Sequence, residues 1–278
     1  LGLMQTGLRR SFGLDRLGVI GEGSESVMAQ DFGLSTSVVR AAGTLSHPNL
    51  LGAYLDLTLP VFLALALIDR NVRRRWVWIG ALAVGVPARV CTLSRASWGA
   101  FAIGCAVAIV LLVGNRLLDL RRALTLTLVG AALALVAMAP LSPMIVKRLS
   151  FNFSESLDFR DDMNRLALRM FRSSPVLGVG LNNFTVAFEE IEPENAAKMK
   201  REWGTIAATH NLYLLVLSET GLAGLGAFFL FWLGYFVRSR QAARSFDPWG
   251  AAVACGTVAG VAATMAGDLL AFALWLDP

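Results

Sequence analysis

The stretch that decides the fold of this chain is AATHNLYLLVLSETGLAGLGAFFLFWLGYF, residues 207–236. From Leu212 onward almost every side chain is apolar, and the run is long enough to cross about 30 Å of hydrocarbon as a helix. The run directly follows the longest polar segment of the sequence, with His210 at the junction. The stretch therefore predicts a membrane-spanning helix that begins at a titratable ring on the lipid–water boundary.

The composition of the whole chain is that of a membrane protein. Of its 278 residues, 55% are hydrophobic and only 16% are charged, whereas soluble domains are about one quarter charged. The formal net charge is +5, and only three of the 25 basic residues are lysines. This balance favours anionic partners such as lipid headgroups or phosphates. The three cysteines, Cys91, Cys105 and Cys255, lie in apolar runs, which is typical of small buried side chains.

Six apolar runs are long enough to span a bilayer. They lie at about 50–68, 76–94, 97–114, 123–141, 211–237 and 250–276. The sequence therefore predicts an all-α polytopic membrane protein with about six spans. Because the chain begins in mid-pattern and stops just after an apolar run, we expect it to be a fragment of a larger bundle.

Every second loop between the expected spans carries several arginines. They are Arg70, Arg73, Arg74 and Arg75, then Arg116, Arg121 and Arg122, then Arg238, Arg240 and Arg244. Under the positive-inside rule these three loops face the cytoplasm. We therefore expect an outer loop region at 1–49, four spans within 50–141, a large outer loop at 142–210 and two spans within 211–278.

The outer segment 142–210 is long enough to carry helices of its own. The clearest is expected at about 156–173, where four apolar residues recur at helical spacing: Phe159, Met163, Leu166 and Met170. Arg165, Arg169 and Arg172 fall on the opposite, solvated side, among acidic residues that can pair with them. Residues 189–202 have the composition of a solvated polar stretch.

Three residues at the expected membrane surface are candidates for chemistry. His210 titrates near neutrality, so it either caps and anchors the helix or acts as a general base. Asn211 either caps the span or binds substrate. Arg160 points away from the solvated arginines, toward the side of Ala167 and Phe171. A planar guanidinium beside apolar neighbours suits a phosphate.

Two further arginines lie where arginine is costly. Arg95 occupies an outward-facing turn between two spans, where it either snorkels to lipid phosphates or holds a substrate phosphate. Arg89, inside the second span, is expected to face the bundle interior or a watery cavity, and it is a second candidate for substrate binding. The intramembrane acids are Asp56, Glu219 and Asp268. Among them we expect Glu219 to pair internally with Arg89.

Motifs for cofactors are absent from the sequence. The only histidines are His47 and His210, and no HExxH motif or cysteine cluster occurs, which argues against a catalytic zinc. The pair Gly178 and Gly180 lacks the third glycine of a dinucleotide loop. We expect no metal, no other cofactor and no nucleic-acid partner. Gly221, Gly224 and Gly226 predict close helix packing.

Several motifs, taken together, resemble the O-antigen ligase/polymerase superfamily over about residues 44–240. They are Phe159-Arg160, Leu-Arg-Met-Phe at 168–171, Pro-Val-Leu-Gly-Val-Gly at 175–180, Asn183-Phe184, and His210-Asn-Leu-Tyr followed by Glu219-Thr-Gly221. Ser-His-Pro-Asn-Leu at 46–50 and Leu-Ser-Arg-Ala-Ser-Trp at 93–98 fit the same pattern. One departure is Asn164, which stands where members of the family usually carry a tryptophan.

The resemblance implies a multi-pass glycosyltransferase of the bacterial inner membrane. Such enzymes move a glycan from a polyprenyl-diphosphate carrier to an acceptor on the outer face, without a metal. The family's essential histidine then corresponds to His210, its outer-loop arginine to Arg160 and its arginine after the short turn to Arg95. We expect these three side chains to gather at one site that binds an anionic group.

Several alternatives stay open at this point. The acceptor is a lipid A-core, another glycan or a protein. A membrane transporter or channel that uses Arg89, Asp56 and Glu219 is an alternative from another functional class. A non-catalytic membrane partner of a larger assembly is a third.

Overall fold

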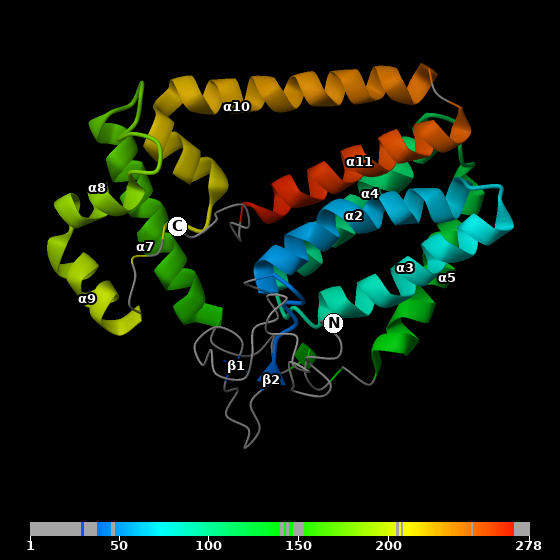
Figure 1. Cartoon of the computed structure of the whole chain (residues 1–278), viewed down its shortest axis with the longest axis horizontal. Coiled ribbons are helices and arrows are strands. Elements are labelled where there is room, and N and C mark those ends of the chain that lie inside the picture. Colours follow the sequence, from blue (N-terminus) through cyan, green and yellow to red (C-terminus); the bar gives the residue numbers. More distant parts are fainter. Residues whose placement is uncertain are drawn as a thin grey trace. The chain divides into compact units, whose positions relative to one another are not determined.

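A computed structural model of the chain is shown in Figure 1. It describes residues 29–30, 38–45, 48–139, 142, 145–146, 153–203, 206, 208–245 and 247–269. The helices are α2 (Pro48–Ile68), α3 (Val72–Val90), α4 (Arg95–Gly114), α5 (Leu120–Met138), α7 (Phe153–Ser173), α8 (Phe184–Ile191), α9 (Pro193–Trp203), α10 (Leu212–Ser245) and α11 (Pro248–Gly267). Two short strands, β1 (Ala29–Gln30) and β2 (Val38–Val39), pair antiparallel.

The chain divides into two compact units. The first comprises Leu1–Phe151 with Arg238–Gly267, and the second comprises Asn152–Val237 with Asp268–Pro278. The sequence predicts a division of the chain into spans and outer loops according to their expected position in the membrane. These two units do not test that division. Most of the expected loop region 1–49, the first part of 142–210 and the end of the expected span 250–276 lie outside the described residues.

In the first unit, α2 packs against α3, α4 and α11, and α11 also packs against α4. In Figure 1, α2 and α11 run side by side. Small residues on α11 permit this approach, because a Cβ atom on Gly260 would collide with the main-chain carbonyl of Leu57. Close packing through small residues is the usual way in which helices associate inside a membrane.

Among the residues that the structure describes, four helices are long and apolar enough to cross a membrane. They are α2, α4, α11 and the part of α10 from Leu212 to Arg244. The expected spans 76–94 and 123–141 form α3 and α5 but are not among these four. The helical fold is therefore confirmed, whereas six spans and an outer loop stay predictions.

The second unit is built on α7. Its expected apolar stripe is confirmed, because Met163, Leu166 and Met170 are buried and Phe159 packs against the same cluster. Residues from α8 and α9, such as Phe188 and Met199, complete this core. The polar stretch 189–202 is thus helical over much of its length and contributes buried side chains, which its composition did not indicate.

The helix α10 is broken at Gly221, which adopts φ 64° and ψ −162°. This backbone conformation is essentially restricted to glycine. A Cβ atom at Gly221 would also collide with the carbonyl group of Val176. Gly221 was expected to allow close helix packing, whereas the structure shows that it breaks the helix and admits a neighbouring loop.

The loop between α7 and α8 replaces the hydrogen bonds that the break removes. In an unbroken helix the carbonyls of residues 218 and 219 would accept from the amides of residues 222 and 223. Here the two carbonyls accept from the amides of Val179 and Gly180, both at 2.9 Å. The freed amides donate to the carbonyls of Pro175 at 2.9 Å and Val176 at 3.1 Å. The loop thereby satisfies all four backbone groups.

Alanine at Gly221 is predicted to destabilise the protein, whereas alanine at Gly226 is not. The positive φ angle alone costs about 1–3 kcal/mol for a residue with a Cβ atom. Gly226 lies on the same helix with nothing within 4 Å of the position of its Cβ, so alanine there is favourable or neutral. Thermal unfolding of the purified protein in detergent measures the difference, and equal melting temperatures for the two variants would contradict it.

Candidate active site

The residues before His210 are fastened to α7. Ile206 and Ala208 are buried in the core of the second unit. Thr209 is fully buried, and its hydroxyl donates to Oδ1 of Asn164 at 2.7 Å. Because Thr209 is bonded to α7, it positions the next residue, His210, relative to that helix.

His210 lies against one turn of α7. Its ring is half-buried, with its centroid 6.1 Å from that of Phe159 at an interplanar angle of 60°. Arg160 follows Phe159 on α7 and is also half-buried. Asn164, which binds Thr209, stands one helical turn after Arg160. The turn from Phe159 to Asn164 therefore holds both the histidine and the arginine of the candidate site.

The surroundings of His210 favour its neutral form. Burial lowers the pKa of His210 below its usual value, and the positive charge of Arg160 lowers the pKa further. Both effects disfavour the charged form, since an imidazolium loses hydration on burial and is repelled by the guanidinium. The lowered pKa favours the neutral ring, in which one nitrogen can accept a proton.

Asn211 caps α10. Its Oδ1 atom accepts from the amides of Tyr213 at 3.0 Å and Leu214 at 3.1 Å. The amide of Leu212 donates to the carbonyl of Asp268 at 3.0 Å. The expectation that Asn211 caps the helix is confirmed, while a role in binding substrate stays a prediction.

The other arginines of α7 form the expected solvated face. Arg165 pairs with Asp161 at 2.6 Å, and Arg169 pairs with Glu192. Both arginines are well exposed, so these pairs contribute little to stability. Arg160 differs from them in its burial and in its proximity to His210.

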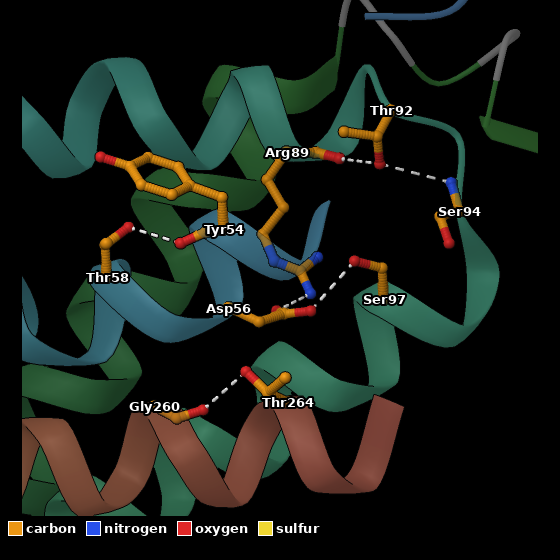
Figure 2. A network of polar contacts seen from close by, with 9 residues as sticks. All are labelled: Tyr54, Asp56, Thr58, Arg89, Thr92, Ser94, Ser97, Gly260 and Thr264. Atoms are coloured by element: carbon orange, nitrogen blue, oxygen red, sulfur yellow. Dashed lines mark hydrogen bonds and ion pairs between the residues drawn. The ribbon is translucent and has the colours of Figure 1, made fainter. Parts of the chain in front are cut away.

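Arg89 lies in the interior of the first unit, where it pairs with Asp56. Figure 2 shows that Arg89 at the end of α3 meets Asp56 of α2, while Ser97 of α4 approaches the same carboxylate. The Ser97 hydroxyl donates to Asp56 at 3.1 Å. The guanidinium also lies over the ring of Phe101, 4.9 Å from its centroid. Both charged groups are buried, and each compensates the other.

The predicted pair between Glu219 and Arg89 is wrong. The Glu219 carboxylate instead accepts from the amides of Asn182 at 3.0 Å and Phe184 at 3.1 Å, which places it at the start of α8. Backbone amides satisfy it in place of an arginine. The transporter alternative is not supported, because Asp56 and Arg89 are committed to each other and Glu219 belongs to the second unit.

Arg95 is the first residue of α4 and is half-buried. It belongs to the first unit, as Arg89 does, whereas Arg160 and His210 belong to the second. The structure thus brings His210, Arg160 and Asn211 together. The gathering of Arg95 with them stays a prediction. Within the described residues, no three His, Cys, Asp or Glu side chains form a group that could hold a metal ion.

Two features of the site were missed in the sequence. The bond between Asn164 and Thr209 joins residues far apart in the chain, although Asn164 follows Arg160 at helical spacing and Thr209 precedes His210. The tilted ring contact between Phe159 and His210 was not expected either, because Phe159 was assigned to the apolar stripe and to a family motif.

Removal of one member of the Asp56–Arg89 pair is predicted to destabilise the first unit. Asp56→Leu leaves a buried positive charge, which costs about 3–5 kcal/mol, whereas Asp56→Leu combined with Arg89→Met removes both charges and restores most of the stability. Thermal unfolding in detergent compares the three proteins. A double variant as unstable as Asp56→Leu would contradict the pairing. The double variant also tests the prediction that Arg89 binds substrate. If that prediction holds, the folded double variant is inactive.

The comparisons with known proteins identify one family. A family model described as O-antigen ligase matches residues 88–229, about half of the chain. The match runs from the end of α3 into the second part of α10, and includes Arg89, Arg95, Arg160 and His210. The comparison with curated proteins finds no match.

Proposed function

Because the chain belongs to the O-antigen ligase family, we propose that it moves a glycan from a polyprenyl-diphosphate carrier to an acceptor at the outer face of the bacterial inner membrane. The family and the apolar helices make it an integral membrane protein. In the proposed topology there are six spans, the arginine-rich loops face the cytoplasm, and residues 142–210 form an outer loop that carries α7, α8 and α9.

The observation that carries the proposal is the contact between His210 and the Phe159–Arg160 turn of α7. A neutral imidazole and a guanidinium are the two groups that this transfer needs, one for the acceptor and one for the donor. His210 stands just before α10, whose length and composition suit a membrane span, and Arg160 lies near His210 on α7. A lipid diphosphate would present its phosphates at that depth.

In the proposed reaction the acceptor hydroxyl oxygen attacks the anomeric carbon of the glycan. His210 takes the hydroxyl proton as the new carbon–oxygen bond forms. The bond from the anomeric carbon to the diphosphate breaks, and its electron pair leaves with the polyprenyl diphosphate. Arg160, together with Arg95, binds the diphosphate and stabilises the charge that develops on it. These arginines would take the place of a divalent cation.

Alanine at His210 or at Arg160 is predicted to remove most of the transfer activity. The loss of a general base lowers the rate by roughly 10²–10⁴-fold, and the loss of one group that stabilises the developing charge lowers it by roughly 10²–10³-fold. Release of polyprenyl diphosphate by the purified full-length protein in proteoliposomes measures both.

Arg165→Ala provides the matched control, since Arg165 lies on the exposed face of the same helix. It is expected to retain activity, and all three variants are expected to insert and purify as the unchanged protein does. Full activity of either the His210 or the Arg160 variant would discard the mechanism. That result would favour a non-catalytic partner in a larger assembly.

A further inference from the structure

The loop between α7 and α8 exposes apolar side chains in a stretch without charge. No charged residue occurs in the sixteen residues from 173 to 188. Within it, Val176 is 63% exposed, Leu177 71% and Leu181 80%. Exposed loops are ordinarily polar, and clustered large apolar side chains mark a contact surface.

This loop is held rigidly, so the exposure does not arise from a loose chain. Four backbone hydrogen bonds join residues 175–180 to the break in α10. The Glu219 carboxylate adds two more, from the amides of Asn182 and Phe184. Gly178 lies so close to α10 that a Cβ atom there would collide with the main chain of Glu219. The apolar side chains are therefore presented at a fixed place beside Gly221.

The position at which the loop is bonded to α10 indicates what the exposed side chains of Val176, Leu177 and Leu181 contact. The Leu222 amide donates to Pro175, so the loop adjoins the first residue after the break. Leu222 is itself 58% exposed, and from it to Val237 α10 has no charged residue. Leu230, Phe231 and Leu233 continue the exposed apolar surface along this part of α10. The apolar tip of the loop is thus continuous with the surface of a membrane-spanning helix.

The hydrogen bonds at the break agree with a position of the loop at the edge of the bilayer. In hydrocarbon an unsatisfied backbone group is costly, so a broken helix is tolerated only where protein groups satisfy it. The loop satisfies all four groups of the break without water. A break at the edge of the bilayer requires such an arrangement.

We propose that the segment from Pro175 to Leu181 is a membrane anchor, whose Val176, Leu177 and Leu181 side chains insert among the acyl chains of the outer leaflet. Because the segment joins the end of α7 to the start of α8, it sets the depth of the turn that contacts His210. The proposal requires that α10 spans the membrane and that residues 142–210 lie on the outer side, and it does not require glycan transfer.

The test places a single environment-sensitive fluorophore on the loop. In full-length protein with Cys91, Cys105 and Cys255 replaced by alanine, Leu177→Cys or Leu181→Cys is labelled with NBD and reconstituted into phosphatidylcholine vesicles. Both side chains are exposed, so their replacement leaves the fold intact. Leu230→Cys serves as the lipid-facing reference and Arg172→Cys, on the exposed end of α7, as the aqueous reference.

At Leu177 and Leu181 we expect blue-shifted emission, quenching by lipids that carry a shallow spin label, and protection from iodide, as at Leu230. Quenching by iodide to the extent seen at Arg172 would overturn the proposal. Protection from both quenchers would also overturn it, since another part of the protein would then cover the loop. Purification of each labelled variant as a single species serves as the folding control.

Discussion

Every backbone amide and carbonyl at a break in a membrane helix needs a partner within the protein, and this requirement shapes the second unit. Gly221 breaks α10, and the four groups that lose their helical partners are taken up by residues 175–180. The break turns residues 212–220 away from the direction of the remaining helix (Figure 1). Leu215, in this first part, packs in the core with α7, α8 and α9, and Asn211 at its start leads directly to His210.

The buried Arg89 and the half-buried Arg160 differ in what they face. Arg89 meets the Asp56 carboxylate, so its charge is balanced and serves to join α2, α3 and α4. Arg160 lies near an imidazole, and its charge lowers the pKa of His210. A guanidinium that keeps a neighbouring base neutral also suits a negatively charged substrate group. The pair with Asp56 supports a structural role for Arg89, whereas a catalytic role for Arg160 is part of the proposed function.

Sequence periodicity predicted the helical elements well, because burial of one face leaves a regular pattern. The stripe of α7 and its solvated arginines are examples. Contacts to the main chain left no such pattern. The partners of Glu219 are the amides of Asn182 and Phe184, which any residue type supplies, so a pair with an arginine was expected instead. Gly221 was misassigned for the same reason, since a break and a packing contact both call for glycine.

The most direct test of the account is the pH dependence of kcat/KM, set against the titration of His210 itself. In a His47→Gln variant His210 is the only histidine, so its pKa can be read from one imidazole signal by NMR. The account predicts that this pKa lies below about 6.5. It also predicts that kcat/KM is constant above this pKa and falls tenfold per pH unit below it, because the base must be unprotonated. A rate that does not fall through that pKa would show that His210 is not the base.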